Sequence, residues 1–443
     1  MDWPCGDIRL LGSMQQSART RTGDETMLYI AGNTESRADE ATACGTPFHE
    51  ATSSEMRTTW WYAWDKYIVP DVYTSMPREL AAIRSAVAMI DMSPLPKMEV
   101  SGRDAHALID WLMTRDMRRL EVNQVMFTPW CNHDGFIVGD GLVFRLAPDK
   151  FIVSGETSHA WFASQSGELE VEIRNVSDDY GILSLQGPKS FDLMQAATGL
   201  DWSGLKFSQI GRVTIAGVDI LVARQGFTGE LGFELWVPKS GGATVWRHFQ
   251  SAGRSFGVVC AGEYAVDVAR IEAGLILVSA DYNGAGPDPR TARVDVVDDL
   301  HITPFEAGLS RLVDLNGDFV GRDALKAINA SPEPKRCFVG LRYDTGELLR
   351  IAAQRSAYGT ALSRVFWGSM RAFKEGELVG RASSLAYSAT LCQAISFGFV
   401  PDRLSSVGST VEVELKDDDG SALDLVRATV VRLPFVEIKR SKG

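Results

Sequence analysis

Glu234 is a carboxylate inside an otherwise apolar strand pattern, Gly232-Phe233-Glu234-Leu235-Trp236. Burying a carboxylate without hydrogen-bond donors is costly, so this side chain either faces solvent or meets a partner that supplies N–H groups. Most glutamates are exposed, and the residues alone leave both alternatives open. If it is buried, the carboxylate suits a bidentate grip on a planar N–H/NH₂ edge, such as that of a pterin or a guanidine.

Asp140 is a second carboxylate in an apolar setting, flanked by Gly139 and Gly141 in the run GFIVGDGLV. Glycines on both sides suit a turn, where an aspartate commonly bonds its own backbone. The alternative is an aspartate at the meeting point of two strands, placed to orient or stabilise a reacting nitrogen. The sequence makes Asp140 a catalytic candidate on this second interpretation.

Arg224 and Arg270 are candidate anchors for an anion, because a guanidinium binds carboxylates in a planar fork. A surface salt bridge is the simpler interpretation of either residue taken alone.

An aromatic cluster follows the first folded residues and includes Tyr62. Such rings can enclose a methylammonium by cation–π contact or stack on an aryl substrate, and core packing is the alternative. A tyrosine hydroxyl here is also a candidate acid for a leaving group, with nothing in the spacing to select one. The cluster comprises Trp60, Trp61, Tyr62, Trp64, Tyr67 and Tyr73.

Several other chemistries lack their motifs. The six cysteines and six histidines are scattered, without a C-x-x-C or H-E-x-x-H pair, so neither a protein-ligated metal nor a disulfide framework is expected. There is no P-loop, no nucleophile elbow and no dinucleotide fingerprint. The net charge of −12 disfavours nucleic acid and anionic membranes as partners. With no signal peptide and no apolar run of membrane length, a cytoplasmic protein is expected.

The elements that must position these residues are mixed α/β units. A chain of 443 residues suggests about three domains. A short strand, a glycine and a helix follow one another three times, around Gly102, Gly187 and Gly321. Hairpins over residues 213–222 and 226–237, and helices over 244–255 and 263–273, lie between these units. Residues 1–44 show no periodicity and are expected to form a loose extension.

Two features mark the second half of the chain. Residues 280–303 form a long stretch rich in Gly, Pro and Asp, of the kind that is often functional or mobile. The run Ala330-Ser331-Pro332-Glu333-Pro334 marks a domain boundary. The segments beyond it are spaced like the strands of a small β-barrel or sandwich.

In combination, these motifs resemble the aminomethyltransferase (glycine cleavage T-protein) family and its tetrahydrofolate-dependent demethylase relatives. The resemblance extends from residue 46 to about residue 436, and its most specific parts are RQGFTGELGFELWVP and ARIEAGL with TPFEAGL. Weaker parts, in family order, are TPF, VNQ, GFIVGDGLV, LSLQGP, DFVGRDAL and GFVP.

The resemblance implies an α+β fold, a three-domain cloverleaf around a central channel that binds tetrahydrofolate. Residues 45–330 are then two intertwined folate-binding domains, and residues 331–443 are a C-terminal β-barrel domain. By position, the family's pterin-binding carboxylate corresponds to Glu234 and its catalytic-region aspartate to Asp140. Arg224, Asn123 and Phe227 fall on further folate-site positions, and Arg270 joins this set as an anion anchor.

Four departures from the T-protein pattern concern the substrate side. The chain has Phe227-Thr228-Gly229-Glu230-Leu231-Gly232 for Tyr-Thr-Gly-Glu-Asp-Gly, and Gly139-Asp140 for Asp-Asp. It also has Ser93-Pro94-Leu95 for Ser-His-Met, and Val266 where the family's helix has its first Arg. These changes suggest that the folate half is kept and the substrate half is rebuilt.

The function predicted on this basis is transfer of a methyl or one-carbon group from a small N-, O- or S-methylated compound to tetrahydrofolate. Alternatives are a true glycine-cleavage aminomethyltransferase, or a folate-binding protein without turnover. A detached folate domain that works with a flavoprotein partner is a further alternative. A homo-oligomer also stays open.

Overall fold

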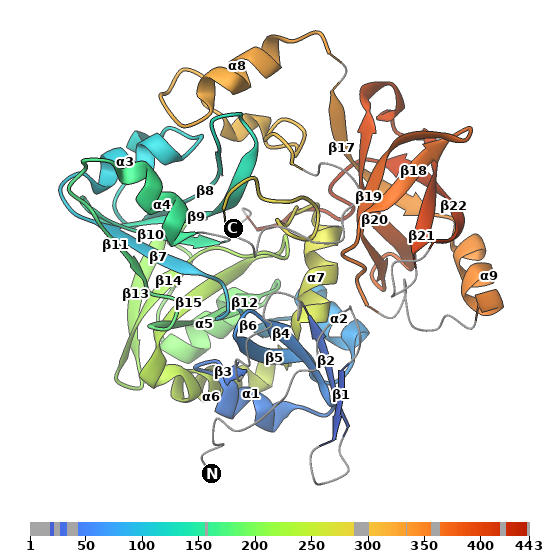
Figure 1. Cartoon of the computed structure of the whole chain (residues 1–443). Helices are drawn as coiled ribbons and strands as arrows, with labels where there is room; N and C mark the ends of the chain where they lie inside the picture. Colours follow the sequence, from blue (N-terminus) through green and yellow to red (C-terminus); the bar gives the residue numbers. More distant parts are fainter. Residues whose placement is uncertain are drawn as a thin grey trace.

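The computed structural model describes the backbone of residues 18–21, 27–32, 43–155, 158–287, 301–333, 335–355, 364–416 and 422–440. Helices and mostly antiparallel sheets form an α+β fold with a separate barrel, as Figure 1 shows. Among the described residues, no helix is long and apolar enough to span a membrane.

A six-stranded sheet carries Glu234, in the order β13-β14-β15-β12-β6-β16. Leu183, Leu185, Phe233 and Leu235 lie on one face and pack on α5 and α6. The side chains that alternate with them point to the opposite face. The elements are β6 (Ala88–Asp91), β12 (Tyr180–Gln186), β13 (Ile210–Ile215), β14 (Val218–Ala223), β15 (Gly232–Pro238), β16 (Val259–Cys260), α5 (Ser190–Thr198) and α6 (Gly242–Ala252).

A five-stranded sheet carries Asp140, in the order β11-β7-β10-β9-β8. Its outer face packs on α3 and α4 through a cluster that includes Val143 and Phe151. Phe144 and Ile152 instead join a core shared with the six-stranded sheet, so the inner faces of the two sheets meet. The elements are β7 (Lys97–Ser101), β8 (Gln124–Cys131), β9 (Ile137–Ala147), β10 (Lys150–Gly155), β11 (Glu172–Asn175), α3 (Ala105–Leu112) and α4 (His159–Ser166).

The C-terminal region forms a closed barrel in the order β17-β20-β19-β18-β21-β22, which confirms the predicted β-barrel. It is drawn in orange and red beside the two sheets in Figure 1. After the barrel the chain returns to the centre, where the Lys439 amide donates to the Gly229 carbonyl at 2.8 Å. The elements are β17 (Arg336–Tyr343), β18 (Met370–Lys374), β19 (Glu377–Ser388), β20 (Gln393–Pro401), β21 (Thr410–Lys416), β22 (Ala422–Val431) and α9 (Thr345–Arg355).

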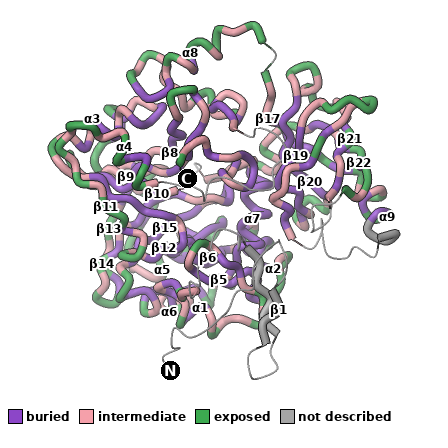
Figure 2. The backbone as a smooth tube through the Cα atoms, viewed as in Figure 1, coloured by how far each residue is buried: buried purple, intermediate pink, exposed green. Residues whose placement is uncertain are grey.

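Helix α7 (Glu263–Glu272) stands between the sheets and the barrel, and every one of its residues is buried. It contacts β5 (Tyr67–Val72) and the barrel strands β19 and β20. Figure 2 shows the helix among other buried segments. It ends at Gly274, whose φ of +72° fits the predicted C-cap. The remaining helices are α1 (His49–Glu55), α2 (Met76–Ser85) and α8 (Arg322–Ala330).

The structure departs from two sequence-based expectations. Within residues 1–44, strands β1 (Ala18–Arg21) and β2 (Met27–Gly32) form, whereas the sequence predicts a loose extension. They pair with each other, and β2 also pairs with the distant β4 (Trp60–Trp64), in a sheet completed by β5 (Tyr67–Val72) and β3 (Cys44–Gly45). Local patterns do not show the pairing of β2 with β4. Gly321 precedes a helix as expected, but no strand leads into it. Residues 288–300 of the long acidic stretch lie outside the described residues.

Candidate active site

Glu234 is buried on the inner face of the six-stranded sheet, between Ser184 of β12 and Ala223 of β14. Burial raises the pKa of its carboxyl to about 7. Among the described residues, none donates a hydrogen bond to it or forms an ion pair with it. The indole N–H of Trp236, two residues along the same face, is also buried without an acceptor in the described part of the chain. The inner face of β15 therefore presents an acceptor, the Glu234 carboxylate, and a donor, the Trp236 N–H, that have no partners among the described residues.

Asp140 lies on β9 and accepts a hydrogen bond from the Tyr282 hydroxyl, with 2.5 Å between the oxygens. Burial raises the pKa of Asp140 to about 6; the Tyr282 hydrogen bond lowers this pKa, and the charge of Asp281 raises it. The carboxyl therefore changes charge close to neutral pH. A group with such a pKa can stabilise positive charge or exchange a proton during a reaction.

Asp140 and Glu234 lie on the inner faces of the five-stranded and six-stranded sheets, and these two faces pack against each other. The rings of Phe144 on β9 and Trp236 on β15 lie 4.7 Å apart, so the inner faces touch there. Asp140 shares a face with Phe144 because side chains alternate along a strand, and it lies about 13 Å away along β9. Glu234 lies about 7 Å from Trp236 by the same rule. The fold thus puts the two candidates, which are 94 positions apart in the sequence, on sheet faces that meet.

Arg270 on α7 is fully buried and fully engaged within the protein. Its guanidinium donates to Asp267 at 2.8 Å, to Asp281 at 2.6 Å and to the Ser384 hydroxyl at 2.8 Å. Its contacts tie α7 to the barrel and fix Asp281, the neighbour of Tyr282. This arrangement suits a structural clamp, and it gives no support to the prediction that Arg270 anchors a ligand's anion.

Tyr62 on β4 is buried against the rings of Trp64 and Trp367, with the Arg364 guanidinium over its face at 4.6 Å. Arg364 is itself held by Asp71 in a two-point contact of 2.8 Å and 3.1 Å. Burial raises the pKa of Tyr62 well above its ordinary value, which makes the phenol a weaker acid. Tyr62 thus packs in the core against a cation that the protein itself supplies, and its predicted acid role has no support here.

The other predicted cofactor-binding residues are placed differently. Arg224 donates to the Leu205 carbonyl at 3.0 Å and stacks over Phe191, on the helix-covered side of the sheet. Asn123 accepts from Arg212 at 2.7 Å at the far end of β8. Phe227 packs against the core between the sheets. Of these three, the structure brings only Phe227 towards the space that Glu234 faces, and the binding roles of Arg224 and Asn123 stay predictions.

Sequence reasoning missed Tyr282, which contacts Asp140, and Glu263, a buried acid near Arg364. Tyr282 belongs to the long Gly-, Pro- and Asp-rich stretch, and its position there is the only sequence signal for it. Glu263 begins α7 close to the charges of Asp267 and Arg364, and burial raises its pKa to about 8. No sequence pattern distinguishes Glu263 from the exposed acids that commonly begin helices.

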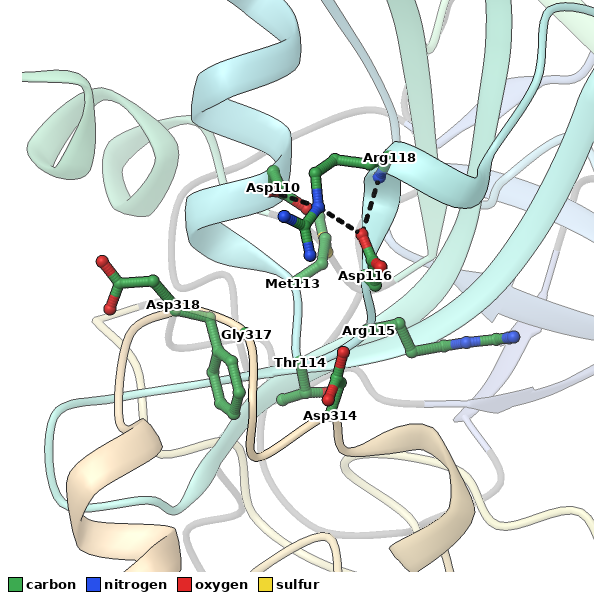
Figure 3. A pocket seen from close by; sticks show the side chains of 10 residues that line it. Asp110, Met113, Thr114, Arg115, Asp116, Arg118, Asp314, Gly317 and Asp318 are labelled. Carbon is green, nitrogen blue, oxygen red and sulfur yellow. Dashed lines mark hydrogen bonds and ion pairs between the residues drawn. The ribbon is translucent and has the colours of Figure 1, made fainter.

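A surface pocket lies elsewhere, between α3 and the segment that precedes α8 (Figure 3). Three of its charged side chains already pair, since Arg118 contacts Asp116 at 2.7 Å and Asp110 at 4.0 Å. None of the predicted site residues lines it, so this pocket is separate from the candidate site. The lining residues are Asp110, Met113, Thr114, Arg115, Asp116, Arg118, Asp314, Gly317, Asp318 and Phe319.

Comparison with known proteins gives matches over most of the chain. The GCVT N-terminal domain matches residues 39–317, and the glycine cleavage T-protein C-terminal barrel domain matches residues 358–437. An aminomethyltransferase of Caldanaerobacter subterraneus subsp. tengcongensis is 31% identical over 79% of this chain and 87% of its own length. One from Desulfitobacterium hafniense is 31% identical over 79% of this chain and 88% of its own length.

The crystal structure of glycine cleavage system aminomethyltransferase T from Bartonella henselae superposes with a TM-score of 0.72 at 22% identity. The match covers 90% of this protein and 99% of the Bartonella henselae chain, and it confirms the predicted fold class. The chain belongs to the aminomethyltransferase (glycine cleavage T-protein) family, and it is accordingly a tetrahydrofolate-dependent one-carbon transferase.

Proposed function

We propose that this protein transfers an aminomethyl-type one-carbon unit to tetrahydrofolate, with Glu234 holding the pterin. The names of its relatives favour an aminomethyl donor over the small methylated donor that the sequence departures suggest. The observation that carries the proposal is the buried Glu234 carboxylate, which has no donor among the described residues. The N–H and NH₂ groups of a pterin edge supply the two donors that this carboxylate lacks.

The residues of the site have distinct roles in this proposal. When bound, tetrahydrofolate supplies the nitrogen that accepts the one-carbon unit. Glu234 orients the pterin, and the nearby Trp236 N–H offers a donor to an acceptor atom of the same ligand. Asp140, ionised above its pKa of about 6, stabilises positive charge that develops near it, and Tyr282 fixes its carboxyl.

A second candidate, a demethylase acting on a small methylated compound, is favoured by one observation. Val266 belongs to the core between the sheets, and Leu95 packs against the same core. Val266 stands where the T-protein pattern has an arginine, so this part of the core is more apolar than the family pattern implies. A donor without a protein carrier is compatible with such a lining.

The test is calorimetric titration of tetrahydrofolate into the wild type and Glu234→Gln, followed by two activity assays. We expect the variant to bind tetrahydrofolate at least about tenfold more weakly, since a hydrogen bond to a charged group contributes about 1.5 to 3 kcal/mol. Turnover of an aminomethyl-lipoyl carrier protein supports the first candidate. Turnover of free methylated amines alone supports the second. Equal binding by both proteins overturns the role of Glu234.

A further inference from the structure

Arg381 on β19 is a buried cation that has no hydrogen-bonding or ion-pair partner among the described residues. Its side chain is 8% exposed, and none of its three guanidinium nitrogens has a hydrogen-bond acceptor among the described residues. The guanidinium lies 3.9 Å from the centre of the Phe399 ring, which covers one of its faces. Its planar edge is therefore the part available to a ligand.

An unpaired buried charge is expensive, so Arg381 needs an explanation. Burial and, to a smaller extent, the positive charge of Arg336 lower its pKa to about 9, so the group stays charged at neutral pH. Desolvating such an ion costs several kcal/mol unless an anion compensates it. We therefore expect the Arg381 guanidinium to pair with an anion.

The carboxylates near Arg381 are already committed to other groups. Glu306 accepts from Arg336 at 2.7 Å and from the Thr303 amide at 2.9 Å. Asp281 accepts from Arg270 at 2.6 Å and from the Ser383 hydroxyl at 2.7 Å. Both raise the pKa of Arg381 through their charge, but neither is bonded to it. The missing anion must come from outside the described part of the fold.

Arg381 is connected to the candidate active site by short contacts. Ser383 lies two residues along the same face of β19, about 7 Å away, and its hydroxyl bonds Asp281. Asp281 precedes Tyr282, which bonds Asp140. An anion on Arg381 would thus lie on the barrel side of the space that Asp140 faces.

We propose that Arg381 binds the carboxylate of a reactant in this space, a role that rests on the proposed one-carbon transfer at Asp140 and Glu234. A guanidinium edge matches the two oxygens of a carboxylate. The negative charges of Asp281 and Glu306 favour a monoanion over a dianionic phosphate. The carboxylate belongs either to the one-carbon donor or to the glutamate part of tetrahydrofolate.

The experiment compares wild type with Arg381→Met and with the control Arg371→Met, which removes an exposed guanidinium from the paired position on β18. Tetrahydrofolate and tetrahydropteroate, which lacks the glutamate, are titrated calorimetrically into each protein. N-methylglycine and N-methylethanolamine, in which a hydroxymethyl group replaces the carboxylate, are titrated in the same way.

A loss of about tenfold or more in Arg381→Met for tetrahydrofolate, but not for tetrahydropteroate, assigns the carboxylate to the cofactor. The same loss for N-methylglycine, but not for N-methylethanolamine, assigns it to the donor. Wild-type affinity of Arg381→Met for both carboxylates overturns the inference. Failure of the wild type to bind either tetrahydrofolate or tetrahydropteroate instead overturns the proposed function, so the two failures are distinguishable.

Stability gives a readout independent of any ligand. We expect Arg381→Met to unfold at a higher urea concentration than the wild type when no ligand is present, because it removes an uncompensated buried charge. A lower midpoint would mean that Arg381 is bonded within the protein, which contradicts the inference.

Discussion

Replacing Glu234 with glutamine should stabilise the ligand-free protein and weaken its cofactor binding. In the folded chain the pKa of this carboxyl is raised by burial to about 7, against an ordinary value of 4.5. Because the folded-state pKa is raised, the contribution of this carboxyl to the free energy of unfolding is fully present below pH 4.5 and is lost as the pH rises through 7. Glutamine has nearly the same shape but does not ionise, so the variant does not lose this stability as the pH rises.

The size of the effect follows from the pKa shift. At 1.36 kcal/mol per unit, the shift from 4.5 to about 7 corresponds to about 3 kcal/mol at pH values well above 7. At about pH 5 the wild type has lost only about 1 kcal/mol, because its unfolded state is then only partly ionised. The advantage of Glu234→Gln should therefore grow by about 2 kcal/mol between about pH 5 and about pH 8.

Urea unfolding followed by tryptophan fluorescence at several pH values measures this advantage, and calorimetry measures tetrahydrofolate binding on the same samples. Glu412→Gln is the matched control, since Glu412 is an exposed glutamate on barrel strand β21. We expect no pH-dependent difference for it. If Glu234→Gln were less stable than the wild type at about pH 8, the carboxylate would have a partner within the protein, and the argument for a ligand would fail.

Three further predictions concern the surroundings of this site. Tyr282→Phe should move the midpoint of the rate–pH profile above about 6, because it removes the hydrogen bond that lowers the pKa of Asp140; an unmoved or lower midpoint would contradict this role. Arg270→Met should cost about 3 to 5 kcal/mol in urea unfolding, since it leaves two buried carboxylates unpaired, and a cost below about 1 kcal/mol would refute the clamp. Gly141→Ala should cost about 1 to 3 kcal/mol, because its Cβ would lie 2.4 Å from the Ser154 carbonyl oxygen, whereas Gly204→Ala, with open space around it, is the control expected to cost much less.

Local patterns predicted the elements that carry the site. Alternating apolar residues on either side of Gly217 predicted the hairpin of β13 and β14, and the run after Gly232 predicted β15. The strand that leads to Gly187 and the helix after it were predicted by the same kind of local signal. Such signals work because they depend on residues only a few positions apart. Strands β1 and β2 lacked one, since β2 pairs with the distant β4 and β1 joins the sheet only through β2.

The sequence determined the chemistry that this protein has available and, through the order of its motifs, the family to which it belongs. It placed Glu234 and Asp140 in apolar strands but left open whether solvent or protein surrounds them. Only the tertiary structure decided that Glu234 is buried with no donor among the described residues, that Tyr282 bonds Asp140, and that Arg270 is engaged in internal ion pairs. Burial and hydrogen bonding depend on which distant segments meet, and a side chain's pKa follows from that meeting rather than from its neighbours along the chain.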